Sequence, residues 1–244
     1  MNKQLFTAAS AVLATCFLTI NAEAGESKSF YVKVGGGIAM PTKKDSTIDQ
    51  GGPKLSSGDL APQKLKNGNS IYAGLGYNLA DNVRVELEYN EYTGIGRKVF
   101  WKSQSPTQKL KARNLLLNAY YDFTNNSQFT PYLGFGVGVS QVETGKLSLR
   151  GEVNPNNYSI LSPQKKRVHT LAYKLAVGAN YKLNETVSFD LGYSFAKLGK
   201  FSIFAREDRY DSNTSSFNYA ILNNPTKTKV IHAHSLTAGL RVSF

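Results

Sequence analysis

Histidine is the residue type in this chain best suited to acid–base chemistry or metal binding, and the chain has three histidines. A histidine with a serine two positions along the same strand face is typical of a lipid-hydrolysing pair. Position 236, two after His234, is leucine, and Ser235 belongs to the opposite strand face. His232 and His234 share a face but lack a carboxylate as a third metal ligand. We therefore expect interfacial histidines, no enzyme activity such as lipid A hydrolysis, no metal and no cofactor.

A second group of residues is charged and recurs inside segments that are otherwise small and apolar. Its members stand at similar distances from short polar turns: Lys33, Glu86, Asp190 and Arg241. Because buried charges must be paired, they are expected to form a structural network in the interior of the fold. Further charges extend this network on either side: Arg84, Asp122 and Lys182 on one side, Glu88 and Lys174 on the other. The alternative is a weak ion channel.

A third group is cationic, lies among aromatic residues, and contributes to a formal net charge of +12. Such a group suits an acidic protein surface or a sulfated glycan, and equally the anionic head groups of lipopolysaccharide. The candidate partner-binding residues are Arg97, Lys98, Trp101, Lys102, Lys165, Lys166, Arg167, Arg206 and Arg209. Nucleic acid is a poor candidate, since no recognition motif is present.

Eight segments of strict alternation must position these three groups. They cover residues 30–40, 71–79, 83–90, 114–123, 132–140, 171–182, 187–196 and 235–244. Side chains on a strand alternate between two faces, so each segment has one apolar face and one face of small or polar residues. The apolar face holds the even-numbered positions in the first and last segments and the odd-numbered positions in the other six.

The connections alternate between short and long. Polar turns at residues 80–82, 124–129 and 184–186 alternate with long loops at 41–68, 93–108, 143–168 and 198–228. This layout is typical of an outer-membrane barrel, with short periplasmic turns and four long extracellular loops. A soluble β-sandwich or lipocalin-like barrel is the alternative, but the small residues opposite the apolar face favour an apolar exterior. The predicted fold is all-β: an eight-stranded, up-and-down, antiparallel transmembrane barrel.

The last long loop contains two further alternating stretches, at residues 201–204 and 216–221. They are expected to pair as a hairpin above the membrane. Counted as spanning strands they would give a barrel of ten, but the polar stretch at 206–215 leaves them short and favours eight.

The first 24 residues are typical of a secretory signal peptide. Lys3 precedes an uncharged, mostly apolar stretch at residues 5–20, and a small-x-small cleavage pattern follows at 22–24. A lipoprotein anchored through Cys16 is a weaker alternative, since threonine precedes the cysteine and apolar residues follow it. The expected division is a removed leader at 1–24 and a barrel domain at 25–244, which then contains no cysteine.

Four motifs make the chain resemble the OmpA/OmpX-type outer-membrane barrels. They are FYVKVGGG at 30–37, GLGYN at 74–78, GFGVG at 134–138 and AGLRVSF at 238–244. The resemblance is closest to small surface proteins and adhesins of obligate intracellular bacteria. It implies a monomer in the outer membrane with loops at the cell surface, surrounded by lipid and lipopolysaccharide, and recognition of Phe244 by the barrel-assembly machinery. By analogy, the function is adhesion to a host-cell or envelope partner; a purely structural envelope barrel is the alternative.

Overall fold

The computed structural model describes residues 30–42, 65–98, 107–145, 149–154, 157–163, 167–200, 205–211, 216–222 and 230–244. These residues form two antiparallel sheets. The larger sheet consists of β1 (Phe30–Pro41), β2 (Leu65–Lys66), β3 (Gly68–Ala80), β4 (Val83–Lys98), β5 (Thr107–Asp122), β6 (Phe129–Thr144), β9 (Arg167–Lys182), β10 (Val187–Gly199) and β13 (Ile231–Ser243). The smaller sheet consists of β7 (Leu149–Asn154), β8 (Asn157–Pro163), β11 (Ala205–Asp211) and β12 (Ser216–Leu222).

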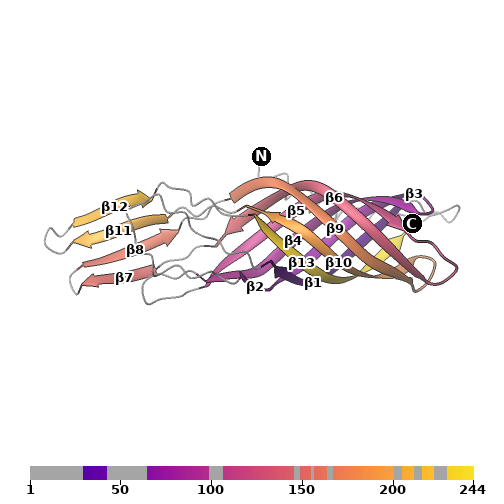
Figure 1. Ribbon diagram of the computed structural model, residues 1–244, viewed down its shortest axis with the longest axis horizontal. Helices are drawn as coiled ribbons and strands as arrows, with labels where there is room; N and C mark the ends of the chain where they lie inside the picture. The colour runs from indigo at the N-terminus through magenta and orange to yellow at the C-terminus, as the bar shows by residue number, and fades with distance from the viewer. Residues whose placement is uncertain are drawn as a thin grey trace.

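The larger sheet closes into a barrel of eight long strands. Each strand pairs with its neighbours in the order β1-β3-β4-β5-β6-β9-β10-β13, and β13 returns to pair with β1 along its length. β2 adds only a two-residue pairing with β4. Figure 1 shows the strands inclined to the long axis of the barrel, as closure requires. The prediction of an eight-stranded antiparallel barrel is confirmed.

The outer surface of the barrel carries the apolar face predicted for each strand. Leu117 and Leu171 are 59% and 67% exposed, whereas Leu116 and Ala172 beside them are fully buried. Near the short-turn end, the rings of Phe30 and Tyr77 pack at a tilt and those of Tyr121 and Phe123 meet edge to face, as in the aromatic belts of membrane interfaces. A surface of this kind is stable only in hydrocarbon, because it would otherwise expose a wide apolar band to water.

Inside the barrel, tyrosine rings lie over glycines of the neighbouring strand. Tyr31 is opposite Gly76, and a Cβ on this glycine would collide with the ring. The same holds for three further cross-strand pairs: Tyr72 with Gly35, Tyr120 with Gly134, and Tyr132 with Gly178. The glycines of the interior face therefore make room for tyrosines, which fill a bore otherwise lined by small residues.

Several barrel strands extend further toward the long loops than the alternation predicted. β4 continues eight residues beyond position 90, and β5 begins seven residues before position 114. In β4 the register shifts between Tyr92 and Ile95, and Gly94 has a φ of 73°. Such a bulge reverses the parity of the side chains, so a simple period of two is lost although the backbone pairing continues.

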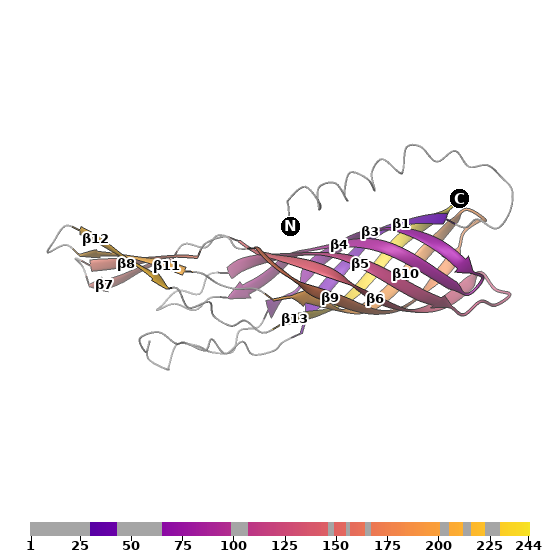
Figure 2. The same ribbon diagram turned by 90° about the horizontal axis from the view of Figure 1, so that it is seen from above.

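The smaller sheet, here called the loop sheet, joins two of the long loops. Its order is β12-β11-β8-β7, so the hairpin of residues 149–163 pairs through β8 with β11 of the last loop. Figures 1 and 2 show it beyond the end of the barrel opposite to the C-terminus. A hairpin in the last loop was predicted, but its first strand is the polar Ala205–Asp211. Residues 201–204, the predicted partner, lie outside the described residues.

Candidate functional site

The interior of the barrel contains a network of buried charges, here called the lumen network. At the level nearest the short turns, the Arg84 guanidinium donates to Asp122 at 2.9 Å and to the Tyr31 hydroxyl at 2.9 Å. Its Nη1 lies 3.6 Å from Glu86 Oε2. The Tyr31 hydroxyl in turn donates to the same Glu86 oxygen at 2.9 Å. β1, β4 and β5 are thus tied together by one guanidinium.

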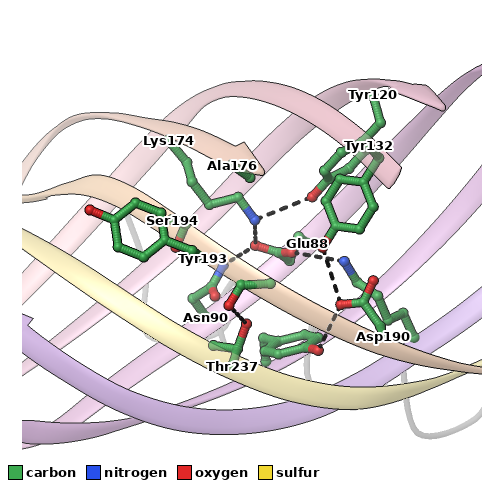
Figure 3. A pocket seen from close by; sticks show the side chains of 13 residues that line it. Glu88, Asn90, Tyr120, Tyr132, Lys174, Ala176, Asp190, Tyr193, Ser194 and Thr237 are labelled. Carbon is green, nitrogen blue, oxygen red and sulfur yellow. Dashed lines mark hydrogen bonds and ion pairs between the residues drawn. The ribbon is translucent and has the colours of Figure 1, made fainter. Parts of the chain in front are cut away.

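Lys33 and Lys174 form the next level of the lumen network. The Lys33 Nζ lies 3.1 Å from Glu86 and 3.6 Å from Glu88, with side-chain exposures of at most 4%. Lys174 reaches Glu88 from the opposite wall of the barrel at 2.5 Å and donates to the Tyr120 hydroxyl at 3.3 Å. Figure 3 shows Lys174 and Glu88 meeting in the bore.

Two of the residues expected to form ion pairs bind other groups instead. Asp190 accepts hydrogen bonds from the hydroxyls of Tyr72 and Tyr132, at 3.4 and 3.3 Å. Arg241 donates to Asn78 at 3.1 Å, and its guanidinium lies 4.0 Å from the centre of the Tyr31 ring. Neither makes an ion pair with another described residue. The tyrosines that fill the space over the glycines lie between these charges. Strand alternation alone did not predict these contacts between tyrosines and charged groups.

The charges of the described interior balance. Four cations accompany four carboxylates: Lys33, Arg84, Lys174 and Arg241 with Glu86, Glu88, Asp122 and Asp190. Lys182 was expected in the network, but it is exposed at the short-turn end of the barrel. The lumen network also borders a polar cavity of about 20 Å³, which is large enough for a single water molecule. The arrangement therefore needs no counter-ion, and such a cavity does not fit an organic ligand.

The long-loop end of the interior is apolar, which the sequence did not predict. Here one buried cluster, called the outer apolar cluster, consists of Ala39, Tyr92, Ile95, Leu110, Ala112, Val142, Ala196, Leu198, Ile231 and Ala233. Each is at most 6% exposed. The sequence does contain a signal for this cluster, because apolar residues replace polar ones at the interior positions near the long loops. In β4 the bulge hides this signal, since it changes which positions face the interior.

On the outside of the barrel, above the apolar band, five charges alternate in sign across β4, β5, β6 and β9. In this outer ladder Glu91 pairs with Lys111 at 2.7 Å and with Arg113 at 3.0 Å. Glu143 pairs with Arg167 at 3.2 Å and lies 4.0 Å from Arg113. Charged groups on the outer face belong outside the hydrocarbon, so the ladder marks an upper limit of the membrane on this side.

The candidate partner-binding residues are distributed among several places. Arg167 is part of the outer ladder and is bound to Glu143. Arg97 and Lys98 lie in the last positions of β4, and Arg206 and Arg209 lie in β11 of the loop sheet. Trp101, Lys102, Lys165 and Lys166 lie outside the described residues. The five described residues therefore lie at three places of the fold: the outer ladder, the end of β4, and β11.

The two histidines of β13 make aromatic contacts rather than a catalytic pair. The Tyr173 hydroxyl lies 2.8 Å from His232 Nε2, and the Tyr193 hydroxyl lies 2.6 Å from His234 Nδ1. The ring of Phe195 packs against both imidazoles. Ser235 is buried on the interior face, as its parity predicted. The described residues contain no group of three or more histidines, cysteines or acids arranged to hold a metal ion. No helix among the described residues is long and apolar enough to cross a membrane.

A closed barrel with an apolar exterior, a paired polar interior and long loops at one end defines an outer-membrane β-barrel protein. The family model described as "Outer membrane protein beta-barrel domain" matches residues 9–244. The chain belongs to this family and is located in the outer membrane, with its long loops at the cell surface.

Relatives and solved structures agree with this assignment. A protein of Rickettsia bellii (strain OSU 85-389) named "Putative adhesin" is 28% identical over 99% of each chain. Outer membrane protein PagN of Salmonella typhimurium is 27% identical over 44% of this chain and 43% of its own. The crystal structure of Neisserial surface protein A has a TM-score of 0.50 and 21% identity, covering 91% of this chain and all of that one. This last likeness concerns the fold alone.

Proposed function

We propose that the protein is a non-enzymatic adhesin, which holds a host-cell or envelope partner through its extracellular loops. The observation that carries the proposal is the loop sheet, which joins two long loops into one ordered surface beyond the barrel. A barrel that served only as an envelope component would not need an ordered projection. The name of the Rickettsia bellii relative points to the same function.

The composition of the loop sheet supports binding through aromatic residues as well as through charge. Tyr158, Tyr210 and Phe217 occupy opposed register positions in three neighbouring strands. The four strands together carry three arginines and four acidic residues, so the loop sheet itself is not basic. In the sequence, the cationic residues are concentrated in two other segments, at residues 97–111 and 165–167. The proposed surface therefore combines the aromatic row of the loop sheet with the cations that these segments of the long loops carry, a combination suited to a sulfated glycan or an acidic protein.

The test measures attachment of the folded barrel, reconstituted in phospholipid vesicles without lipopolysaccharide, to cultured animal cells and to heparin-coated beads. One variant changes Lys98, Trp101 and Lys102 to alanine, and a second changes Tyr210 and Phe217. The control is Lys182→Ala, at the opposite end of the barrel. We expect the native and control vesicles to bind, the cationic variant to lose binding in a salt-dependent way, and the aromatic variant to lose binding at all salt concentrations.

Absence of attachment by the native protein to cells and beads alike would instead favour a structural envelope barrel. Equal binding by all four proteins would show that the loops named here are not the binding surface. Three further expectations, the leader at residues 1–24, recognition of Phe244 by the assembly machinery and a monomeric state, belong to the same proposal.

A further inference from the structure

On the outer face of β4, β5, β6 and β9, the surface changes from apolar to charged within one row of residues. The strand register gives rows of directly opposed positions. Toward the long loops these rows are Leu87, Leu117, Val137 and Tyr173, then Tyr89, Leu115, Val139 and Leu171, and then Glu91, Arg113, Gln141 and His169. Successive residues on one face of a strand are about 7 Å apart, so the charges lie directly against the apolar wall.

The cations of this surface reach further out than its carboxylates. In the outer ladder the side chains of the three cations are 26 to 35% exposed, and those of the two carboxylates only 16 to 17%. A further cation, Lys109, is exposed two positions beyond Lys111 on the outer face of β5. The four cations, here called the outer cationic patch, are Lys109, Lys111, Arg113 and Arg167. With two carboxylates among them, the surface has an excess of two positive charges.

The outer cationic patch consists of two groups. Lys109, Lys111 and Arg113 follow one another on β5, whereas Arg167 lies on β9, with Glu143 of β6 between them. Neighbouring strands are about 4.8 Å apart, so the two groups are about 10 Å apart. A single phosphate cannot bind to both groups. A disaccharide with a phosphate at each end is of comparable length, and its hydroxyl groups can donate to Glu143.

The wall around β1 has a different composition at the same end. The outer face of β1 carries Ile38 and Met40 there. The residues directly opposite them are Asn69, Leu236 and His234. The described outer face of β1 therefore offers no lysine or arginine to a phosphate, and the outer cationic patch belongs to one side of the barrel.

We propose that the outer wall of β4, β5, β6 and β9 binds one molecule of a bisphosphorylated glycolipid of the lipid A type. One phosphate binds the cations of β5 and the other binds Arg167, whose guanidinium suits phosphate oxygens. The acyl chains lie along the apolar rows below. This site is on the side wall of the barrel in the membrane, apart from the loop sheet of the proposed adhesin.

The inference is tested by native mass spectrometry of the folded protein in detergent micelles, purified free of lipopolysaccharide. The protein is titrated with bisphosphorylated lipid A, with monophosphorylated lipid A and with phosphatidylglycerol. The patch variant changes Lys109 and Lys111 to glutamine. The control variant changes Lys182 and Lys200 to glutamine, two exposed lysines that lie elsewhere, so its loss of charge is the same.

We expect the native and control proteins to retain one molecule of bisphosphorylated lipid A, and the patch variant to bind it at least about tenfold more weakly. The native protein should also bind the other two lipids at least about tenfold more weakly than bisphosphorylated lipid A. Heat-dependent gel mobility measures the folding of each protein. If the patch variant does not fold, Arg167→Gln, which removes the cation of the other group, replaces it with the same expected result.

Three results would overturn the inference: no lipid A retained by the native protein, equal binding of phosphatidylglycerol, or unchanged binding by a folded patch variant. Equal binding of phosphatidylglycerol would show a general attraction of anionic lipids to a basic protein. The attachment experiment uses vesicles without lipopolysaccharide, so failure here is distinct from failure of the adhesin proposal.

Discussion

At the scale of single residues, the interior of this barrel depends on charges that share partners. Lys33 lies between Glu86 and Glu88, and Lys174 binds Glu88 from the other wall. Removing one member of such a network leaves a buried charge without compensation, which costs more than the pair itself contributes. The Tyr31 and Tyr120 rings exclude water around these charges, because each fills the space above a glycine.

The change Lys33→Met tests this view of the lumen network. It leaves the buried Glu86 and Glu88 with only Lys174 and Arg84 nearby, and Arg84 is shared with Asp122. The buried negative charge then exceeds the positive charge, so we expect the free energy of unfolding to fall by about 3 to 5 kcal/mol. Urea unfolding in detergent micelles, followed by circular dichroism, measures the loss. Lys182→Met is the matched control, since this lysine is exposed and we expect almost no change. Equal losses in the two variants would contradict a buried network at Lys33.

At the scale of elements, the loop sheet connects strands from two loops that are far apart in sequence. β8 and β11 pair antiparallel over seven positions, with Leu161 opposite Glu207 and Asn157 opposite Asp211. This pairing gives the surface its order, because an isolated two-stranded hairpin is only marginally stable in water. The proposed binding surface therefore depends on both loops.

The pairing of β8 with β11 predicts which engineered cysteines cross-link. Directly opposed residues of antiparallel strands have Cα atoms about 4.5 to 5.5 Å apart, within disulfide range. The variant Leu161→Cys with Glu207→Cys is therefore expected to oxidise to a loop-to-loop disulfide, visible as a gel shift that a reductant reverses. Both proteins are expressed without residues 1–24, so that Cys16 is absent.

The matched control moves one cysteine along the same strand. Asp211 lies four positions from Glu207, about 13 Å along the strand, so Leu161→Cys with Asp211→Cys is not expected to cross-link. Efficient oxidation of the control pair, or none of the opposed pair, would contradict the observed register.

At the scale of the whole molecule, the membrane decides which face of each strand is outside. The exposed apolar residues surround the barrel, and its backbone groups are paired around the full circle because β13 closes on β1. Closure removes the open sheet edges that hydrocarbon does not tolerate. The outer ladder then marks where the polar head groups begin.

A charged residue placed on the outer face distinguishes a membrane barrel from a soluble one. Leu117 lies well below the outer ladder, and Leu117→Arg is expected to destabilise the protein folded in phospholipid vesicles by about 2 to 4 kcal/mol. Phe123→Arg, beside the short turn at the interface, is expected to cost about 0 to 1 kcal/mol. The two values come from urea titrations of vesicle-inserted protein. A soluble barrel would tolerate both changes equally, because both side chains are exposed.

Much of the barrel was predictable from the sequence, whereas less of its interior was. Alternation predicted all eight spanning strands, because each lies between hydrocarbon and a polar bore and so must alternate. Above the membrane this constraint ends, and the extensions of β4 and β5 were missed. The interior charges were placed on the correct face, but the partners of Asp190 and Arg241 were not predicted, since a side chain's neighbours across the bore depend on strand stagger.

The amino-acid sequence by itself determined the number of barrel strands, their direction, and the face that each turns to the lipid, because strand periodicity and turn composition are local properties. Only the tertiary structure decided which residues meet inside and beyond the barrel. The outer apolar cluster brings together residues of six barrel strands, and the loop sheet pairs segments separated by more than forty residues. Such contacts depend on shear, bulges and loop pairing, which arise only when the whole sheet closes.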